Sequence, residues 1–223
     1  MSQNDSFIDE VTEEVRRDRL FQYLRRYGWI AVAVVLVLVG GTAFNEWRKA
    51  EARAEAQARG DAMLAAIRQD EPATRANALI GLDPDGGAVA VSNMLAATEL
   101  QEAGEIEDAV AALDAVATDE AVPAIYRDLA ALKGAMIGAG VRDVETRRAT
   151  LAGLSRPGAP FRVIAQEQLA LIAVDEGDTD AAVEQFRAIA VDAEATRGLR
   201  ERALQMIVAL GGEIEDLALP GGE

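Results

Sequence analysis

The stretch Trp29-Ile-Ala-Val-Ala-Val-Val-Leu-Val-Leu-Val-Gly-Gly-Thr-Ala-Phe44 contains no charged residue. The uncharged window around it runs from Tyr27 to Asn45. At about 1.5 Å of rise per residue, a helix over this window spans roughly 28 Å, close to the hydrocarbon thickness of a bilayer. Tyr27, Trp29 and Trp47 place aromatic rings where the lipid headgroups would lie. The sequence therefore predicts a transmembrane helix over residues 29–44, with these three aromatic residues as membrane anchors.

Two other interpretations of this stretch fit the sequence less well. A buried core helix that is apolar on all sides and bracketed by Arg25-Arg26 and Arg48-Lys49 is out of place in a small soluble domain. A cleavable signal peptide would use the small residues that follow the apolar run, Gly40 to Ala43. The region before the run is long and carries six acidic residues, however, and the run exceeds the usual signal core. We therefore expect an uncleaved signal anchor.

The arginines before the stretch determine the expected orientation, because flanks rich in Lys and Arg tend to stay in the cytoplasm. Five arginines lie close to the N-terminal end of the stretch: Arg16, Arg17, Arg19, Arg25 and Arg26. Four cations also follow it, but so does the whole of the large domain. We expect residues 1–28 to be cytoplasmic and everything from about Asn45 onward to lie outside.

The exported part is strongly acidic. The chain has a formal charge of −16, and residues 29–223 hold 17 basic and 32 acidic residues, a charge of −15. This balance argues against binding to the nucleic-acid backbone and against electrostatic adhesion to anionic lipid, both of which need clustered cations. Solubility alone is a sufficient explanation of the acidic charge.

The chain contains no cysteine and no histidine. Their absence removes disulfides, a thiolate nucleophile, the usual zinc ligands and a histidine general base. With 38 acidic residues, carboxylate pairs will arise by chance, so none is singled out as a catalytic dyad. We find neither a phosphate-binding loop nor a nucleophile elbow, and expect no enzymatic activity, no cofactor and no metal site.

The chain is expected to have four parts. Residues 1–28 form the N-terminal tail, in which residues 1–10 are expected to be disordered and residues 11–27 to form a basic amphipathic helix. That helix either lies on the membrane surface or continues the transmembrane helix, and the pattern favours neither. After the transmembrane helix, residues 45–70 are rich in helix formers and predict a helical stalk. Residues 71–223 form the folded domain.

In the folded domain, apolar-periodic segments alternate with short breaks that contain Gly or Pro. Apolar residues recur at three- and four-residue spacing, and no segment alternates like a strand bounded by hairpin turns. The sequence therefore predicts an all-α domain of antiparallel helix pairs, with helices over residues 73–82, 88–103, 106–117, 122–139, 144–154, 160–176, 180–191 and 197–210.

Two of these helix pairs align with each other. In both, a small residue precedes a Gly by seven positions, an Ala follows that Gly by five, and a large apolar residue comes four later. The matching positions are Ala97, Gly104, Ala109 and Leu113, and Ala170, Gly177, Ala182 and Phe186. Small residues let helices approach closely, and Gly permits a left-handed helix end. We favour a repeated unit over an alanine-rich bundle with chance glycines, although the pair over residues 122–154 lacks the signature.

These offsets match a tetratricopeptide unit, and the chain resembles the tetratricopeptide-like, single-span family that includes the ancillary SecYEG translocon subunit. The resemblance covers nearly the whole chain and is greatest with alphaproteobacterial members. It lies in the order of the parts and in short stretches, namely residues 11–20, residues 25–29, Glu176-Gly-Asp178 with Phe186, and Arg202-Ala203. It implies a bacterial inner-membrane protein with a cytoplasmic N-terminus and a periplasmic α-solenoid domain. That domain would meet newly translocated polypeptides, together with the translocon and periplasmic chaperones.

Stacked helix pairs make a concave surface lined by the first helix of each pair, and such surfaces commonly hold peptides or partner helices. The pattern therefore predicts a partner-binding groove formed by Met94, Thr98, Gln101, Ile164, Glu167, Leu171 and Val174. Its mixed apolar and acidic lining suits unfolded segments that are cationic or mildly hydrophobic. For each residue, plain core packing or a solvated face is the alternative.

Two functions remain open at this point. The first is a non-enzymatic ancillary translocon subunit or chaperone-like factor, with translocon subunits, periplasmic chaperones or unfolded secreted polypeptides as partners. The second is a structural scaffold that tethers an envelope-assembly complex to the inner membrane. A scaffold should hold one folded partner and ignore denatured proteins.

Overall fold

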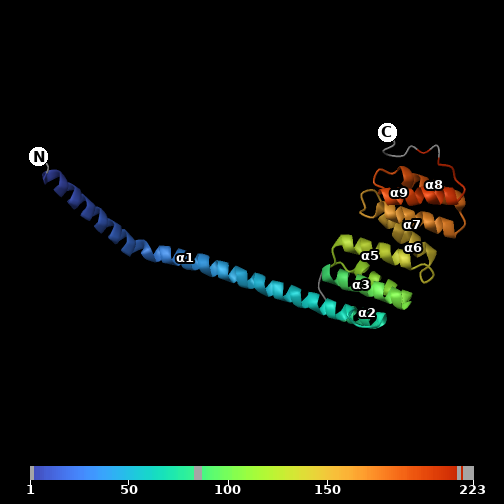
Figure 1. The fold of residues 1–223 in the computed structure, drawn as a ribbon, viewed down its shortest axis with the longest axis horizontal. Helices are drawn as coiled ribbons and strands as arrows, with labels where there is room; N and C mark the ends of the chain where they lie inside the picture. The colour runs from blue at the N-terminus through green and yellow to red at the C-terminus, as the bar shows by residue number, and fades with distance from the viewer. Residues whose placement is uncertain (1–2, 83–86, 215–216, 218–223) are drawn as a thin grey trace. The chain divides into compact units, whose positions relative to one another are not determined.

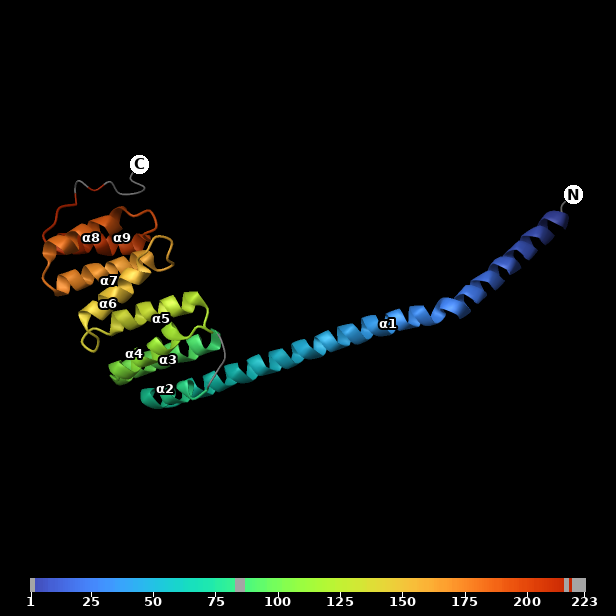
Figure 2. The same cartoon turned by 180° about the vertical axis from the view of Figure 1, so that it is seen from behind.

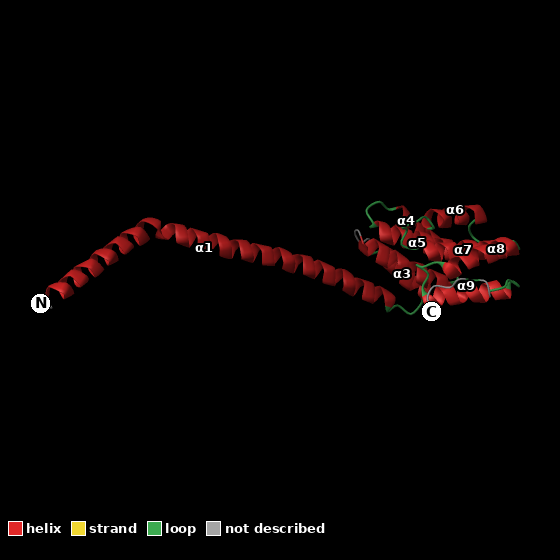
Figure 3. Ribbon diagram, turned by 90° about the horizontal axis from the view of Figure 1, so that it is seen from above, coloured by secondary structure: helices red, strands yellow, loops and turns green. Residues whose placement is uncertain are grey.

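The computed structural model describes residues 3–82, 87–214 and 217, with side chains from Arg25 onward except at Tyr27, Ala31 and Val32. These residues form nine α-helices and no strand, which confirms the all-α expectation (Figures 1 and 3). The helices are α1 (Gln3–Ile67), α2 (Pro72–Ile80), α3 (Gly87–Ala103), α4 (Ile106–Thr118), α5 (Ala124–Ile137), α6 (Val144–Leu154), α7 (Arg162–Asp175), α8 (Thr179–Val191) and α9 (Arg197–Ala209).

The chain divides into two compact units, residues 1–58 and residues 59–223. The first unit is the greater part of α1, which is helical without interruption from Gln3. The expected disorder of residues 1–10 is therefore wrong for residues 3–10. This segment has no Pro or Gly, and its acidic residues are favourable at a helix N-terminus. Side chains of the predicted amphipathic segment up to Leu24 lie outside the described residues.

The apolar part of α1 leaves its side chains uncovered. Among the described residues, residues 28–67 of α1 are the one helical segment that is long and apolar enough, by length and composition, to cross a membrane. Val37, near the middle of the apolar stretch, is 73% exposed, and none of the most apolar window is buried against the rest of the protein.

The second unit, called here the helical stack, contains the last residues of α1 and helices α2 to α9. Each helix packs against the next one along the chain. The turns α3–α4, α5–α6 and α7–α8 lie along one side of the stack, and the loops α4–α5, α6–α7 and α8–α9 along the other (Figures 1 and 2). Met63 and Ala66 near the end of α1 join the core formed by α2, α3 and α4. The expected stalk, residues 45–70, is thus divided between the two units.

The two aligned helix pairs turn in the same way. Gly104 and Gly177 have φ of 80° and 77°, the left-handed conformation predicted for them. The next residue's N–H donates across the helix end in both, from Glu105 to the Leu100 carbonyl and from Asp178 to the Ala173 carbonyl, each at 2.9 Å. In both turns the Gly N–H also donates to the carbonyl of the residue three positions earlier. Together, these two hydrogen bonds form the Schellman motif that ends a helix.

The side chains expected between the helices are buried in both pairs. The four small residues of the signature, Ala97, Ala109, Ala170 and Ala182, are at most 2% exposed, and Leu113 and Phe186 are fully enclosed. The pair α5–α6 differs, as its missing signature indicated. Its turn carries the left-handed residue at Gly140, and Gly138 donates to the Gly134 carbonyl instead. The aligned pairs are therefore equivalent in backbone and packing, which is a repeat-like architecture.

Capping distinguishes the second helices of the two aligned pairs. The Asp178 carboxylate accepts from the Ala181 N–H at the start of α8 (3.1 Å), whereas Glu105 makes no side-chain cap to α4. We expect Asp178→Ala to lower the free energy of unfolding by about 1 kcal/mol, because an N–H of the first turn loses its acceptor. Urea unfolding followed by far-UV circular dichroism measures the change.

Glu105→Ala is the matched control for that variant. It removes an acidic side chain at the equivalent position without removing a cap, so we expect a change below about 0.5 kcal/mol. Equal losses in the two variants would contradict the assignment of the cap.

Candidate protein-binding surface

The structure does not bring the seven predicted groove residues into one groove. They lie on α3 and α7, and three of them serve in packing: Met94 contacts the core around α3, while Leu171 and Val174 contact the core around α8 and α9. Thr98 and Gln101 line one hollow, and Ile164 lines a second. Glu167 is 8% exposed and held in an ion pair.

The first hollow, called here the α3/α5 hollow, has a volume of about 120 Å³. It lies between the first helices of two successive pairs, with Leu113 of α4 between them. Its lining residues are Ala97, Thr98, Gln101, Leu113, Lys133, Met136 and Ile137. Lys133 and Met136 were missed because α5 belongs to the pair without a signature, so its inward face had no position to be aligned with.

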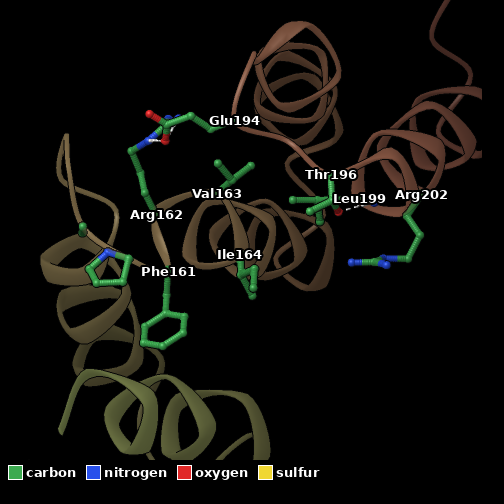
Figure 4. A pocket seen from close by; sticks show the side chains of 10 residues that line it. Phe161, Arg162, Val163, Ile164, Glu194, Thr196, Leu199 and Arg202 are labelled. Atoms are coloured by element: carbon green, nitrogen blue, oxygen red, sulfur yellow. Dashed lines mark hydrogen bonds and ion pairs between the residues drawn. The ribbon is translucent and has the colours of Figure 1, made fainter. Parts of the chain in front are cut away.

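The second hollow, called here the α7/α9 hollow, has a volume of about 220 Å³ and is shown in Figure 4. The loop before α7, the start of α7, the α8–α9 loop and the start of α9 surround it. Its lining residues are Ala159, Pro160, Phe161, Arg162, Val163, Ile164, Glu194, Thr196, Leu199 and Arg202. Ile164 is 39% exposed, so an apolar side chain remains open to a partner.

Ion pairs hold the walls of the α7/α9 hollow. The Arg162 guanidinium donates to both carboxylate oxygens of Asp192 at 2.8 Å. It also donates to Glu194 (Figure 4). Arg202 donates to both oxygens of Glu167, at 2.8 and 3.0 Å. These hydrogen bonds raise the pKa of Arg162 and of Arg202 above the usual arginine value. Because Arg202 neutralises Glu167, the acidic lining expected from that residue is not available to a cationic partner.

The ion pair with Arg162 makes stability depend on pH. Hydrogen bonds from Arg162 hold the pKa of Asp192 below the ordinary value of 3.8. A carboxylate with a lowered pKa stabilises the fold above its ordinary pKa, and this contribution is lost as the pH falls through the folded-state value. We expect Asp192→Asn to be less stable than the wild type at pH 7, with the difference closing below pH 3.8.

The measurement is the urea unfolding free energy at a series of pH values. Glu184→Gln, which alters an exposed carboxylate on α8, is the control and should change the unfolding free energy by less than about 0.5 kcal/mol at pH 7. A deficit in Asp192→Asn that stays constant at acidic pH would show that lost packing, rather than the ionised pair, causes it.

The predicted membrane anchors lie on α1. Trp29 and Trp47 are exposed, and the Trp47 ring lies 6.1 Å from the Phe44 ring between centroids. The Tyr27 side chain lies outside the described residues. Exposed indole rings at the two ends of an apolar helix match the positions that Trp takes at membrane–water interfaces.

Comparison with protein-family models, curated proteins and solved structures found no match to this chain. Within the described residues, no group of three or more Asp and Glu side chains is arranged to hold a metal ion. The helical stack and its two hollows are therefore the basis for a functional proposal.

Proposed function

We propose that this chain is a non-enzymatic, single-span protein of the bacterial inner membrane whose tetratricopeptide-like, α-solenoid domain binds proteins in the periplasm. Residues 29–44 cross the membrane, with residues 1–28 in the cytoplasm. The protein acts as an ancillary translocon subunit or a chaperone-like factor that receives newly secreted polypeptides. It needs no cofactor.

The observation that carries the proposal is that two open hollows lie on a scaffold of repeated helix pairs. The first hollow lies between the first helices of two successive pairs, α3 and α5, and the second lies between α7, the first helix of the last pair, and α9, the helix that follows this pair. This is the surface on which stacked helix-pair proteins hold peptides. Both hollows combine apolar side chains with a few polar groups, the combination found in ligand-binding pockets. The exposed apolar part of α1 would keep such a binding domain at a membrane.

The first test is purification of tagged full-length protein from its own membranes in mild detergent, with co-purifying proteins identified by mass spectrometry. We expect translocon subunits and periplasmic chaperones, and we expect them to be lost when residues 29–44 are replaced by an unrelated span. Recovery of one envelope-assembly complex instead would support the scaffold.

A second test separates a chaperone-like factor from a scaffold. Full-length protein in lipid nanodiscs is mixed with a chemically denatured client, and aggregation is followed by light scattering. Stoichiometric amounts should slow aggregation, whereas empty nanodiscs should not. If the protein has no more effect than empty nanodiscs, the chaperone-like function is rejected.

A further inference from the structure

Lys133 is the one cationic side chain that lines the α3/α5 hollow. It is partly buried in α5 and makes no hydrogen bond or ion pair with any residue that the structure describes. The chain has only two lysines, and the other, Lys49, is exposed on α1 and paired with Glu46 at 3.2 Å. Lys133 therefore brings an uncompensated positive charge to a hollow in an otherwise acidic unit.

Three acidic side chains of α3 and α4 have arginine partners. Arg75 binds Glu99 at 2.6 Å and Glu102 at 3.1 Å. Asp114 is paired with Arg142, and both groups lie beside Gly134, the residue that follows Lys133. These three carboxylates are thus paired with arginines, and none of them is paired with Lys133.

The remaining lining of the hollow suits a carboxylate attached to an aliphatic chain. The Gln101 side-chain amide makes no hydrogen bond within the described part of the chain and can donate an N–H. The Thr98 hydroxyl already donates to the Met94 carbonyl at 3.0 Å, so it is not a donor for the ligand. Met136 and Ile137 supply apolar walls for the carbon atoms next to the carboxylate.

Charge favours a monoanion as the ligand of this hollow. Residues 59–223 hold 14 basic and 29 acidic residues, a formal charge of −15. The carboxylates of Glu105, Glu107 and Asp108 are exposed at the nearby α3–α4 turn. A doubly charged group such as a phosphate would meet this excess negative charge with a single ammonium to balance it, whereas a carboxylate is matched by one lysine.

We propose that the α3/α5 hollow binds a carboxylate of a partner polypeptide, with Lys133 as its counter-ion and Gln101 as a second donor. The inference rests on the proposed protein-binding function and specifies the chemistry of one contact. It reverses the charge preference expected from the sequence, which favoured cationic segments.

The presence of only two lysines makes lysine footprinting a direct test. Full-length protein in detergent micelles is acetylated with and without an N-acetylated peptide of alternating Ala and Leu, and mass spectrometry follows Lys133 and Lys49 separately. The peptide is supplied as the free acid, as the C-terminal amide, and as an amide with Glu at its last position. We expect the free acid to slow acetylation of Lys133 at least about fivefold and to leave Lys49 unchanged, because a bound carboxylate covers the ammonium.

Affinity measurements assign this protection to the lysine charge. With a neutral fluorescent label on the peptide, we expect the free acid to bind about tenfold to a hundredfold more tightly than the amide, as for a charge-assisted hydrogen bond. Lys133→Gln should abolish the difference, Lys133→Arg should keep most of it, and the control Lys49→Gln should not alter it. Far-UV circular dichroism checks that each variant is folded.

The peptide forms also separate the two sources of a carboxylate. If the amide with a Glu binds like the free acid, the hollow accepts side-chain carboxylates; if it binds like the plain amide, the hollow requires a chain terminus. Equal binding of acid and amide, or no binding by any form up to about 1 mM, a free energy of about −4.1 kcal/mol, overturns the inference. Co-purification of translocon subunits in that event would leave the proposed function in place.

Discussion

Phe186→Ala is expected to lower the free energy of unfolding of the helical stack by about 3–5 kcal/mol, the range for removing a buried aromatic ring. Phe186 is 1% exposed and lies in the core that α7, α8 and α9 share. The small residues Ala170 and Ala182 bring the helices close together and cannot extend to fill the space left by the ring. A loss of this size is a large fraction of the stability of a typical domain.

Urea unfolding followed by far-UV circular dichroism measures this loss. Both tryptophans precede the helical stack, so their fluorescence would not report on it. Phe186→Leu should lose about 1–2 kcal/mol, because most of the apolar volume remains. Val208→Ala removes a side chain that is 56% exposed on α9 and should cost less than about 0.5 kcal/mol. Similar losses in Phe186→Ala and Val208→Ala would contradict the core role of Phe186.

Replacing Leu36 and Val37 together by Asp is expected to release the full-length protein from the membrane. Both residues lie near the centre of the uncharged window, and each Asp there opposes insertion by about 2.5–3.5 kcal/mol. The nine aliphatic and aromatic side chains Ile30, Val32, Val34, Val35, Leu36, Val37, Leu38, Val39 and Phe44 favour insertion by only about 0.3–0.6 kcal/mol each. Two charges therefore offset the whole gain.

Alkaline carbonate extraction of membranes measures this change. The wild type should stay in the pellet and the double Asp variant should move to the supernatant. The control is the same pair replaced by Ala, which shortens the side chains without adding charge and should remain in the pellet. If the wild type itself is extracted, or its mature N-terminus begins after Ala43, residues 29–44 are not an uncleaved transmembrane anchor.

The helices and their ends could be predicted from the sequence because local chemistry determines them. Apolar spacing located α3 to α9 within two residues at every end, and Gly104 and Gly177 marked two turns that the structure confirms. The buried positions of Ala97 and Ala170 also followed, since a helix pair needs small residues at its closest approach. The exception was the N-terminal segment, where a polar composition predicted disorder and residues 3–10 are helical.

The sequence predicted the candidate site much less well than it predicted the helices. Thr98, Gln101 and Ile164 do line hollows, but Leu171 and Val174 pack into the core, because helical spacing alone does not say which of two partly apolar faces meets a neighbour. No local sequence pattern marked Lys133 as a residue that lines a hollow. The partners of Arg162 lie about 30 residues away, as the pair with Asp192 shows, so only the packing of α7 against the α8–α9 loop brings them together.

Packing of each helix on the next one in the chain has a consequence for folding kinetics. The main packing partners of every helix from α2 to α9 are its neighbours in sequence, with α3 against α5 as a smaller contact, so loop-closure entropy is small at each step and the relative contact order is low. Three cores follow one another along the chain, the first from the end of α1 to α5, the second between α5 and α7, and the third around α7 to α9. Either end of the stack can therefore acquire structure before the other does.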